Sequence, residues 1–176
     1  MFESKTSTEL WYELLKEGQE NARITLTEIE ESHSVFMLQR FIRRTDFGSI
    51  PFALQYLEQV LSWGKIERQR ILSDVGDACL IMAGFFPERA KRVNVSSSYF
   101  MDLSQTCYQE HAELSAYMKR KGEAALYQEV GKSVPKIAHV LNASKNKVCQ
   151  ELSSLTTGRR NSSVSKRTPL QSPMSP

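Results

Sequence analysis

The sequence predicts an all-α protein, a single bundle of about five to six helices with a disordered C-terminal tail. Apolar residues recur at three- and four-residue steps over most of the chain, which is the spacing of one face of an α-helix. Helix-starting motifs precede these runs, and no alternating apolar–polar run indicates a strand. With 176 residues, 40% of them hydrophobic, the chain is long enough to bury the core of one globular domain.

The first two helices are each predicted by a capping box, in which a hydroxyl and a carboxylate satisfy free backbone N–H groups. The boxes are Thr6-x-x-Glu9 and Thr25-x-x-Glu28. Pro51 suits the first turn of a third helix that continues to Leu61. The apolar positions of these helices are Leu10, Trp11, Leu14 and Leu15, then Leu26, Ile29, Phe36, Met37 and Phe41, then Leu54, Leu57 and Leu61.

Three further helices are expected in the second half of the domain. Gly64 precedes a long helix that Pro87 should kink or end near Gly84. Ser96 and the two serines after it offer N-caps for the next helix, and Gly122 is expected to separate that helix from the last one. The apolar positions are Ile71, Val75, Cys79, Met82 and Phe86, then Phe100, Leu103, Cys107, Leu114 and Met118, then Leu126, Val130, Ile137 and Leu141.

One face of the long helix is made of small residues. Gly76, Cys79, Leu80 and Ala83 share this face, and three of the four are small. A glycine inside a helix costs about 1 kcal/mol against alanine, so its presence predicts that a neighbouring helix approaches closely here.

The segments GDACLIMAGFFPER and VSSSYFMDLSQTCY resemble those of an uncharacterised bacterial protein family. In that family a GD-containing helix ends in a GFFPER-like corner, and an aromatic pair opens the next helix. The resemblance covers roughly residues 26–142. It implies an all-helical fold and no particular chemistry, because no function is known for the family.

Positive charge gathers at the C-terminus. Residues 1–142 carry 17 Lys/Arg and 19 Asp/Glu, whereas residues 143–176 carry 6 and 1. The latter segment is rich in Ser, Thr and Pro, and it has too few large apolar side chains to offset the entropy of ordering. We therefore divide the chain into a helical domain, 1–142, and a basic flexible tail, 143–176.

The sequence also predicts the compartment. No run of eighteen apolar residues suggests a membrane-spanning helix, and the N-terminus lacks the pattern of a signal peptide. Cys79, Cys107 and Cys149 lie far apart, which suits reduced thiols better than a disulfide framework. We expect a soluble, cytoplasmic protein with no membrane partner.

Asp74 and Asp77 stand on adjacent turns of the long helix, as paired carboxylates do in acid/base and metal sites. Together with Tyr99 and Phe100 they form our candidate pocket for a small molecule or substrate. No third catalytic group is identifiable. The competing interpretation is that both carboxylates are solvated or bonded to an arginine or a tyrosine such as Tyr99.

Two other patterns are incomplete, and we expect no metal, cofactor or catalytic residue. Glu30-x-x-His33 resembles half of a ferritin-like di-iron motif, but Tyr108 and Lys136 stand where His111 and His139 would each need a glutamate. Gly131-Lys132-Ser133 resembles the end of a phosphate-binding loop. The earlier glycine and the preceding strand of such a loop are missing.

The stretch KIAHVLNASKNKVCQEL, residues 136–152, allows two interpretations. In a degenerate helix-turn-helix over 135–155, Asn142 would form the turn and Ser144 would cap the second helix. The candidate nucleic-acid contacts would then be Lys145, Asn146, Lys147, Gln150, Arg159 and Arg160. In the other interpretation this stretch is the last bundle helix running into the tail.

We therefore predict a non-enzymatic interaction or regulatory protein that binds another protein. The alternative is a DNA-binding protein that uses residues 135–155 and the basic tail. A weaker alternative is a small-molecule binder or enzyme centred on Asp74, Asp77 and Tyr99. The sequence leaves the oligomeric state open.

Overall fold

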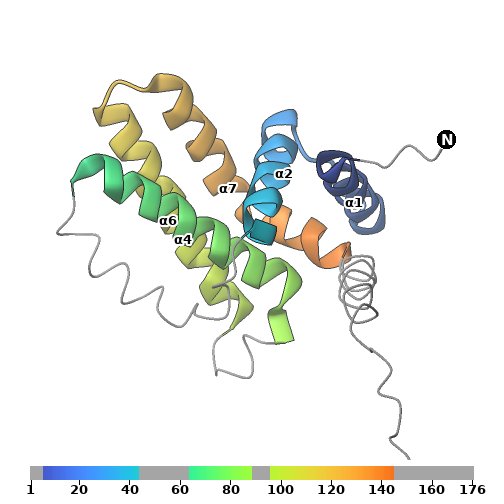
Figure 1. Ribbon diagram of the computed structural model, residues 1–176. Coiled ribbons are helices and arrows are strands. Elements are labelled where there is room, and N and C mark those ends of the chain that lie inside the picture. Colours follow the sequence, from blue (N-terminus) through green and yellow to red (C-terminus); the bar gives the residue numbers. More distant parts are fainter. Residues whose placement is uncertain (1–5, 44–63, 89–95, 145–176) are drawn as a thin grey trace, which may run out of the picture. The chain divides into compact units, whose positions relative to one another are not determined.

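The computed structural model describes residues 6–43, 64–88 and 96–144, and within these ranges the structure is helical with no strand (Figure 1). The all-α prediction is confirmed for them. The predicted helix from Pro51 to Leu61 lies outside the described residues. By its contacts the chain divides into Met1–Lys145 and Asn146–Pro176, and only the first unit contains described residues. Its main helices are α1 (Ser7–Ala22), α2 (Glu28–Arg43), α4 (Lys65–Phe85), α6 (Ser97–Tyr117) and α7 (Lys121–Ala143).

The expected capping box of α1 is confirmed. The Thr6 N–H donates to the Glu9 carboxylate at 2.7 Å, and the Glu9 N–H donates to the Thr6 hydroxyl at 3.3 Å.

The capping box of α2 lies two residues later than predicted. The residues of the box are Thr27 and Glu30 rather than Thr25 and Glu28. The Thr27 N–H donates to the Glu30 carboxylate at 2.8 Å, and the Glu30 N–H donates to the Thr27 hydroxyl at 3.3 Å. Leu26 is buried and its N–H donates to the Gln19 side chain, which keeps the chain out of the helix until Thr27.

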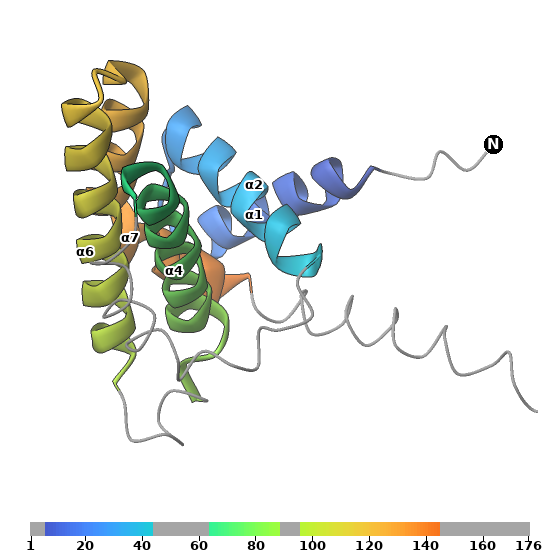
Figure 2. The same cartoon turned by 60° about the vertical axis from the view of Figure 1, so that its left-hand side comes forward.

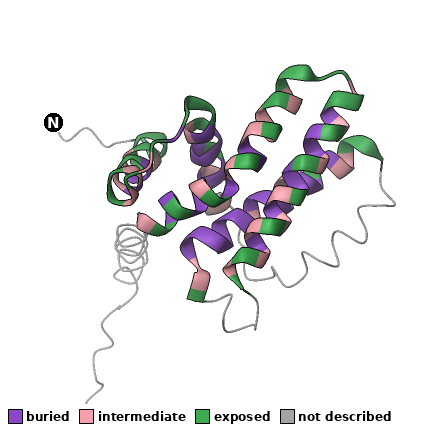
Figure 3. Cartoon of the chain, turned by 180° about the vertical axis from the view of Figure 1, so that it is seen from behind, coloured by how far each residue is buried: buried purple, intermediate pink, exposed green. Residues whose placement is uncertain are grey.

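Three helices, α4, α6 and α7, form one packed group, and α1 and α2 pair with each other beside α7 (Figures 1 and 2). Hydrogen bonds show that α4 and α6 are antiparallel. Ser97 donates to the Ala83 carbonyl at 3.2 Å, Ser104 to the Gly76 carbonyl at 2.9 Å, and Ser115 accepts from Gln69 at 2.6 Å. Figure 3 shows buried residues on the faces that the helices turn toward one another. The described helices include none that is long and apolar enough to cross a membrane.

The small face of α4 brings α6 close, as predicted. A Cβ atom on Gly76 would lie 2.8 Å from the ring of Tyr108 on α6. A second close approach was not predicted: a Cβ on Gly84 would lie 2.6 Å from the Cβ of Leu141 on α7. Both glycines thus permit helix contacts that a larger side chain would obstruct.

The break between α6 and α7 is not at Gly122, which lies in the first turn of α7. It occurs at Lys119, whose φ of 62° is in the left-handed region. The Lys119 N–H donates to the Ala116 carbonyl at 3.0 Å and the Arg120 N–H to the Ser115 carbonyl at 2.9 Å. This pattern is a Schellman motif, in which glycine is the usual residue and lysine is strained.

Replacing Lys119 by glycine is therefore expected to stabilise the protein by about 0.5–1 kcal/mol, because the relief of strain exceeds the added entropy of the unfolded chain. Urea denaturation followed by circular dichroism measures this change. Ala125→Gly, at an exposed position inside α7, serves as the control and should cost about 1 kcal/mol. Equal destabilisation by both substitutions would contradict the role given to Lys119.

The last helix contains Pro135 and changes direction along its length (Figures 1 and 2). Proline has no N–H to donate to the Gly131 carbonyl, and its ring disturbs the preceding turn. The second half of α7 contacts α1, where a Cβ on Gly18 would lie 2.5 Å from the Val140 carbonyl oxygen. Asn21 donates to the Ala143 carbonyl at 3.3 Å at the same junction.

Candidate functional site

A buried polar cluster lies where α2, α4 and α6 meet. The carboxylate of Asp77 accepts hydrogen bonds from the Tyr108 hydroxyl at 2.7 Å and from the Arg40 guanidinium at 2.5 Å. Nε2 of His33 lies 3.4 Å from this carboxylate and 3.2 Å from the Tyr108 hydroxyl. One buried carboxylate is thus shared by three side chains from two neighbouring helices.

The electrostatics of the cluster favour an ionised Asp77. Burial alone would raise the pKa of this carboxyl, but the hydrogen bond and charge of His33 and the charge of Arg40 outweigh burial and lower the pKa. Burial, followed by the Asp77 charge, raises the pKa of Tyr108 well above its ordinary value. At neutral pH, Tyr108 is therefore a neutral donor to a carboxylate.

Tyr127 of α7 extends the cluster toward the α6–α7 turn. Its ring centroid lies 5.7 Å from that of Tyr108 and 3.7 Å from that of His111. The two ring nitrogens of His111 have further polar neighbours. Nε2 lies 3.8 Å from the Glu123 carboxylate, and Nδ1 lies 3.4 Å from the Ser115 hydroxyl. A continuous set of polar and aromatic contacts therefore joins α2, α4, α6 and α7.

His111 makes the free energy of unfolding depend on pH. Burial lowers the pKa of His111, and the Glu123 charge only partly opposes the effect. The folded state thus resists protonation, so the stability associated with neutral His111 is fully present above pH 6.5 and is lost as the pH falls toward the lowered pKa.

We expect His111→Gln to remove this dependence. Between pH 6.5 and 5.5 the wild type should lose up to about 1 kcal/mol more free energy of unfolding than the variant. Urea denaturation at several pH values measures the difference. Glu123→Gln should act in the opposite direction and make the free energy of unfolding fall more steeply as the pH is lowered, since it removes the charge that favours protonated His111. Parallel pH curves for wild type and His111→Gln would contradict this role.

The four residues of the predicted pocket lie in different surroundings. Asp77 is in the buried cluster, Asp74 is half-buried, Phe100 is in the core, and the half-buried ring of Tyr99 lies beside Phe100 with centroids 5.7 Å apart. The tyrosine bonded to Asp77 is Tyr108 and not Tyr99. The antiparallel pairing of α4 and α6 puts Ser104 beside Gly76, so Tyr99 lies more than one turn away from Asp77 along α6.

The half di-iron motif is divided between two sets of contacts. The Glu30 carboxylate lies 2.6 Å from Nζ of Lys136, and it also caps α2, whereas His33 lies beside Asp77. In the described ranges, no group of three or more His, Cys, Asp or Glu side chains could hold a metal ion.

The candidate helix-turn-helix begins inside the bundle. Ile137 and Leu141 are fully buried, and α7 continues through Asn142, where the turn was expected. The helix ends at Ser144, whose hydroxyl donates to the Leu141 carbonyl at 2.9 Å. The candidate contacts Lys145, Asn146, Lys147, Gln150, Arg159 and Arg160 lie outside the described residues.

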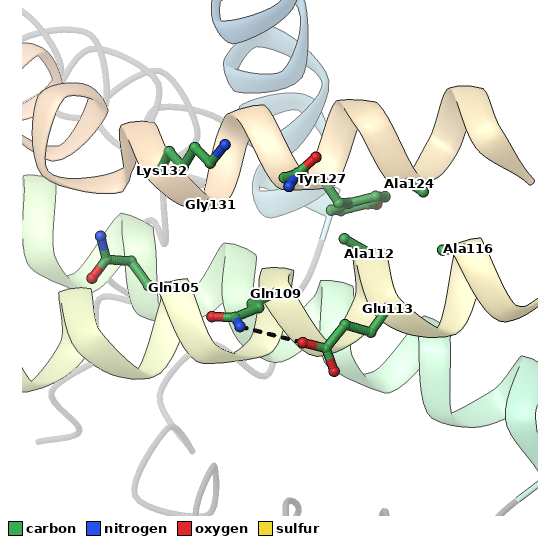
Figure 4. A pocket seen from close by; sticks show the side chains of 10 residues that line it. Gln105, Gln109, Ala112, Glu113, Ala116, Ala124, Tyr127, Gly131 and Lys132 are labelled. Atoms are coloured by element: carbon green, nitrogen blue, oxygen red, sulfur yellow. Dashed lines mark hydrogen bonds between the residues drawn. The ribbon is translucent and has the colours of Figure 1, made fainter.

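An open groove of about 520 Å³ runs between α6 and α7 (Figure 4). Its small residues, Ala112 and Ala116 on α6 and Ala124 and Gly131 on α7, face the same space. The polar side chains of its lining are Gln105, Gln109, Glu113, Gln128 and Lys132. A second hollow shares Ala116, Ala124 and Gln128 with the groove, and it extends the lining to Lys119, Lys121 and Ala125.

Tyr127 belongs to both the groove and the cluster. Its ring lines the groove and also stacks on the buried His111. Neither Tyr127 nor the groove was identified from the sequence. The available signal was the recurrence of alanine at Ala112 and Ala116, a spacing that puts small side chains on one helical face.

Comparison with known proteins found no match to a protein-family model, to a curated protein or to a solved structure.

Proposed function

We propose that this protein is a non-enzymatic interaction module that binds a segment of another protein in the α6–α7 groove. The observation that supports this proposal is the groove itself, an open channel with small residues along its centre and amide side chains around it. Small side chains allow the backbone of a docked segment to approach, and amides can both donate and accept hydrogen bonds.

The buried cluster supports the proposal by holding the groove in shape. Tyr108 and Arg40 both donate hydrogen bonds to Asp77, and the ring of Tyr127 connects Tyr108 to the groove wall. A binding surface fixed before its partner arrives loses less conformational entropy on binding. In this proposal the ionisable groups position helices and do not act on a substrate.

Two buried thiols support a reducing, cytoplasmic environment. Cys79 and Cys107 are free and buried. Burial raises the pKa of Cys79 above its ordinary value and that of Cys107 to about 12, so both are unreactive thiols at neutral pH.

Site-specific photo-crosslinking in extracts of the source cells tests the proposed function. A crosslinker at Gln109, in the groove, should give a discrete product, and one at the exposed Glu20 of α1 should not. The captured protein is identified by mass spectrometry and purified. Its binding to the full chain should be lost in Ala116→Arg, which fills the groove. Equal labelling from both positions, or binding unaffected by Ala116→Arg, would refute the proposal.

Nucleic-acid binding is the second candidate, and the charge of residues 143–176 favours it, with 6 Lys/Arg against 1 Asp/Glu. Fluorescent duplex DNA added to the full chain should then bind with an affinity that falls steeply with salt. The double substitution Lys145→Glu, Lys147→Glu should also weaken binding of the duplex DNA. Absence of binding at low salt would remove this candidate.

A further inference from the structure

We infer that the groove binds an α-helix of about three turns that carries apolar side chains at its centre and an acidic side chain near each end. This inference rests on the proposed function and specifies the partner's chemistry. It follows from the length of the groove, its small-residue centre and the positions of its lysines.

The length of the groove suits a helix of this size. Its α6 wall extends from Gln105 to Ala116, and the eleven steps between these residues rise about 17 Å in a helix. The α7 wall runs antiparallel beside it, with Lys132 toward the Gln105 end and Ala124 toward the Ala116 end (Figure 4). Packed helices lie about 8–10 Å apart, and small facing side chains allow the short end of this range. Ala112, Ala116 and Ala124 provide such positions.

Lysines stand at both ends of this channel. Lys132 lines one end, and Lys119 and Lys121 line its extension at the other end, with all three exposed. Glu113 is the acidic residue of the lining, and it already accepts a hydrogen bond from Gln109 at 3.2 Å. The charge of the lining is therefore complementary to carboxylates spaced about three turns apart.

Charge also argues against two other occupants. A second copy of the chain docked groove to groove would bring its own lysines into the same space. Residues 143–176 of the chain itself carry 6 Lys/Arg and 1 Asp/Glu, so the lysines of the groove would repel them. An acidic helix from another protein meets neither repulsion.

Three labelled helical peptides test this inference on the full chain by fluorescence anisotropy. The end-acid peptide has leucine and alanine at its centre and glutamates at both ends. The centre-acid peptide has the same composition with the glutamates moved to the middle, and the end-basic peptide has lysines in place of the glutamates. The end-acid peptide should bind at least about tenfold tighter than the other two, with an affinity that falls as salt is added.

Variants of the chain assign the binding to the groove. Lys121→Glu with Lys132→Glu should reverse the preference toward the end-basic peptide, and Ala116→Arg should abolish binding of all peptides. Lys16→Glu, which changes an exposed lysine of α1, is the matched control and should change nothing.

Several outcomes would overturn the inference, and they separate it from the proposed function. Equal binding of all three peptides that Ala116→Arg abolishes would refute the acidic partner and leave the groove as a binding site. If no peptide binds while a partner is still crosslinked at Gln109, the acidic helix is likewise refuted and the groove remains a binding site. A dimer that Ala116→Arg dissociates would make a second copy the occupant. Binding of duplex DNA that Lys121→Glu with Lys132→Glu abolishes would assign the lysines to nucleic acid.

Discussion

Replacing Asp77 by alanine is expected to lower the free energy of unfolding by about 3 kcal/mol, because it leaves Arg40, Tyr108 and His33 without their shared acceptor. The estimate is at the lower end for a broken buried ion pair, since the Arg40 side chain is 50% exposed and water compensates part of the loss. Urea denaturation followed by circular dichroism measures the change.

Two further variants isolate the contribution of the cluster. Asp102→Ala removes an exposed carboxylate from α6 and should change the stability by less than about 0.5 kcal/mol. Arg40→Ala should be destabilising in the wild type and much less so in the Asp77→Ala background, because the two groups act as a pair. Additive effects of the two substitutions would contradict a shared hydrogen-bond network.

The Asp77 contribution also has a defined pH window. The pKa of Asp77 is lowered in the folded protein, so its contribution is present above the ordinary value of 3.8 and is lost as the pH falls through the lowered pKa. The difference in stability between wild type and Asp77→Ala should therefore persist at pH 5 and shrink only in stronger acid.

Gly84→Ala is expected to destabilise the protein by about 2 kcal/mol, since the added methyl group would overlap Leu141 of α7. The clash is with a Cβ atom, 2.6 Å away, which moves only if the whole helix moves. Thermal and urea denaturation measure the loss.

Gly122→Ala is the matched control for this substitution. It also adds a methyl group to a helical glycine, but nothing lies within 4 Å of its Cβ position. Because alanine has the higher helix propensity, this variant should gain about 0.5–1 kcal/mol. Similar effects at both glycines would show that the α4–α7 contact tolerates displacement.

The sequence predicts the helices well because their signals are local. The Thr6 cap, the end of α4 before Pro87 and the Ser96 cap of α6 all depend on residues within one or two turns. It fails where two local signals compete. Thr25 and Thr27 are both followed by a glutamate three residues later, and the burial of Leu26 selects Thr27. The left-handed turn also falls at Lys119 rather than at a glycine, and Gly122 lies in a helix.

The sites were harder to predict because they depend on the pairing of distant helices. Asp77 was identified from its spacing with Asp74, yet its tyrosine partner lies 31 residues away on α6. Choosing Tyr108 over Tyr99 requires the register of α4 against α6, which no local pattern contains. The groove likewise depends on which face of the α6–α7 pair the other described helices leave open.

The bend at Pro135 divides α7 into two parts that make different contacts. The part before it lines the groove with Ala124, Tyr127 and Gly131, and the part after it meets α1 near Val140 and Ala143. One hydrogen bond of the helix is missing between them, but α2 contacts both parts, through Thr27 to Glu129 before Pro135 and through Glu30 to Lys136 after it. Substitutions that reshape the groove therefore fall on a different part of α7 from the residues that meet α1, and α2 is the element that ties the two parts together.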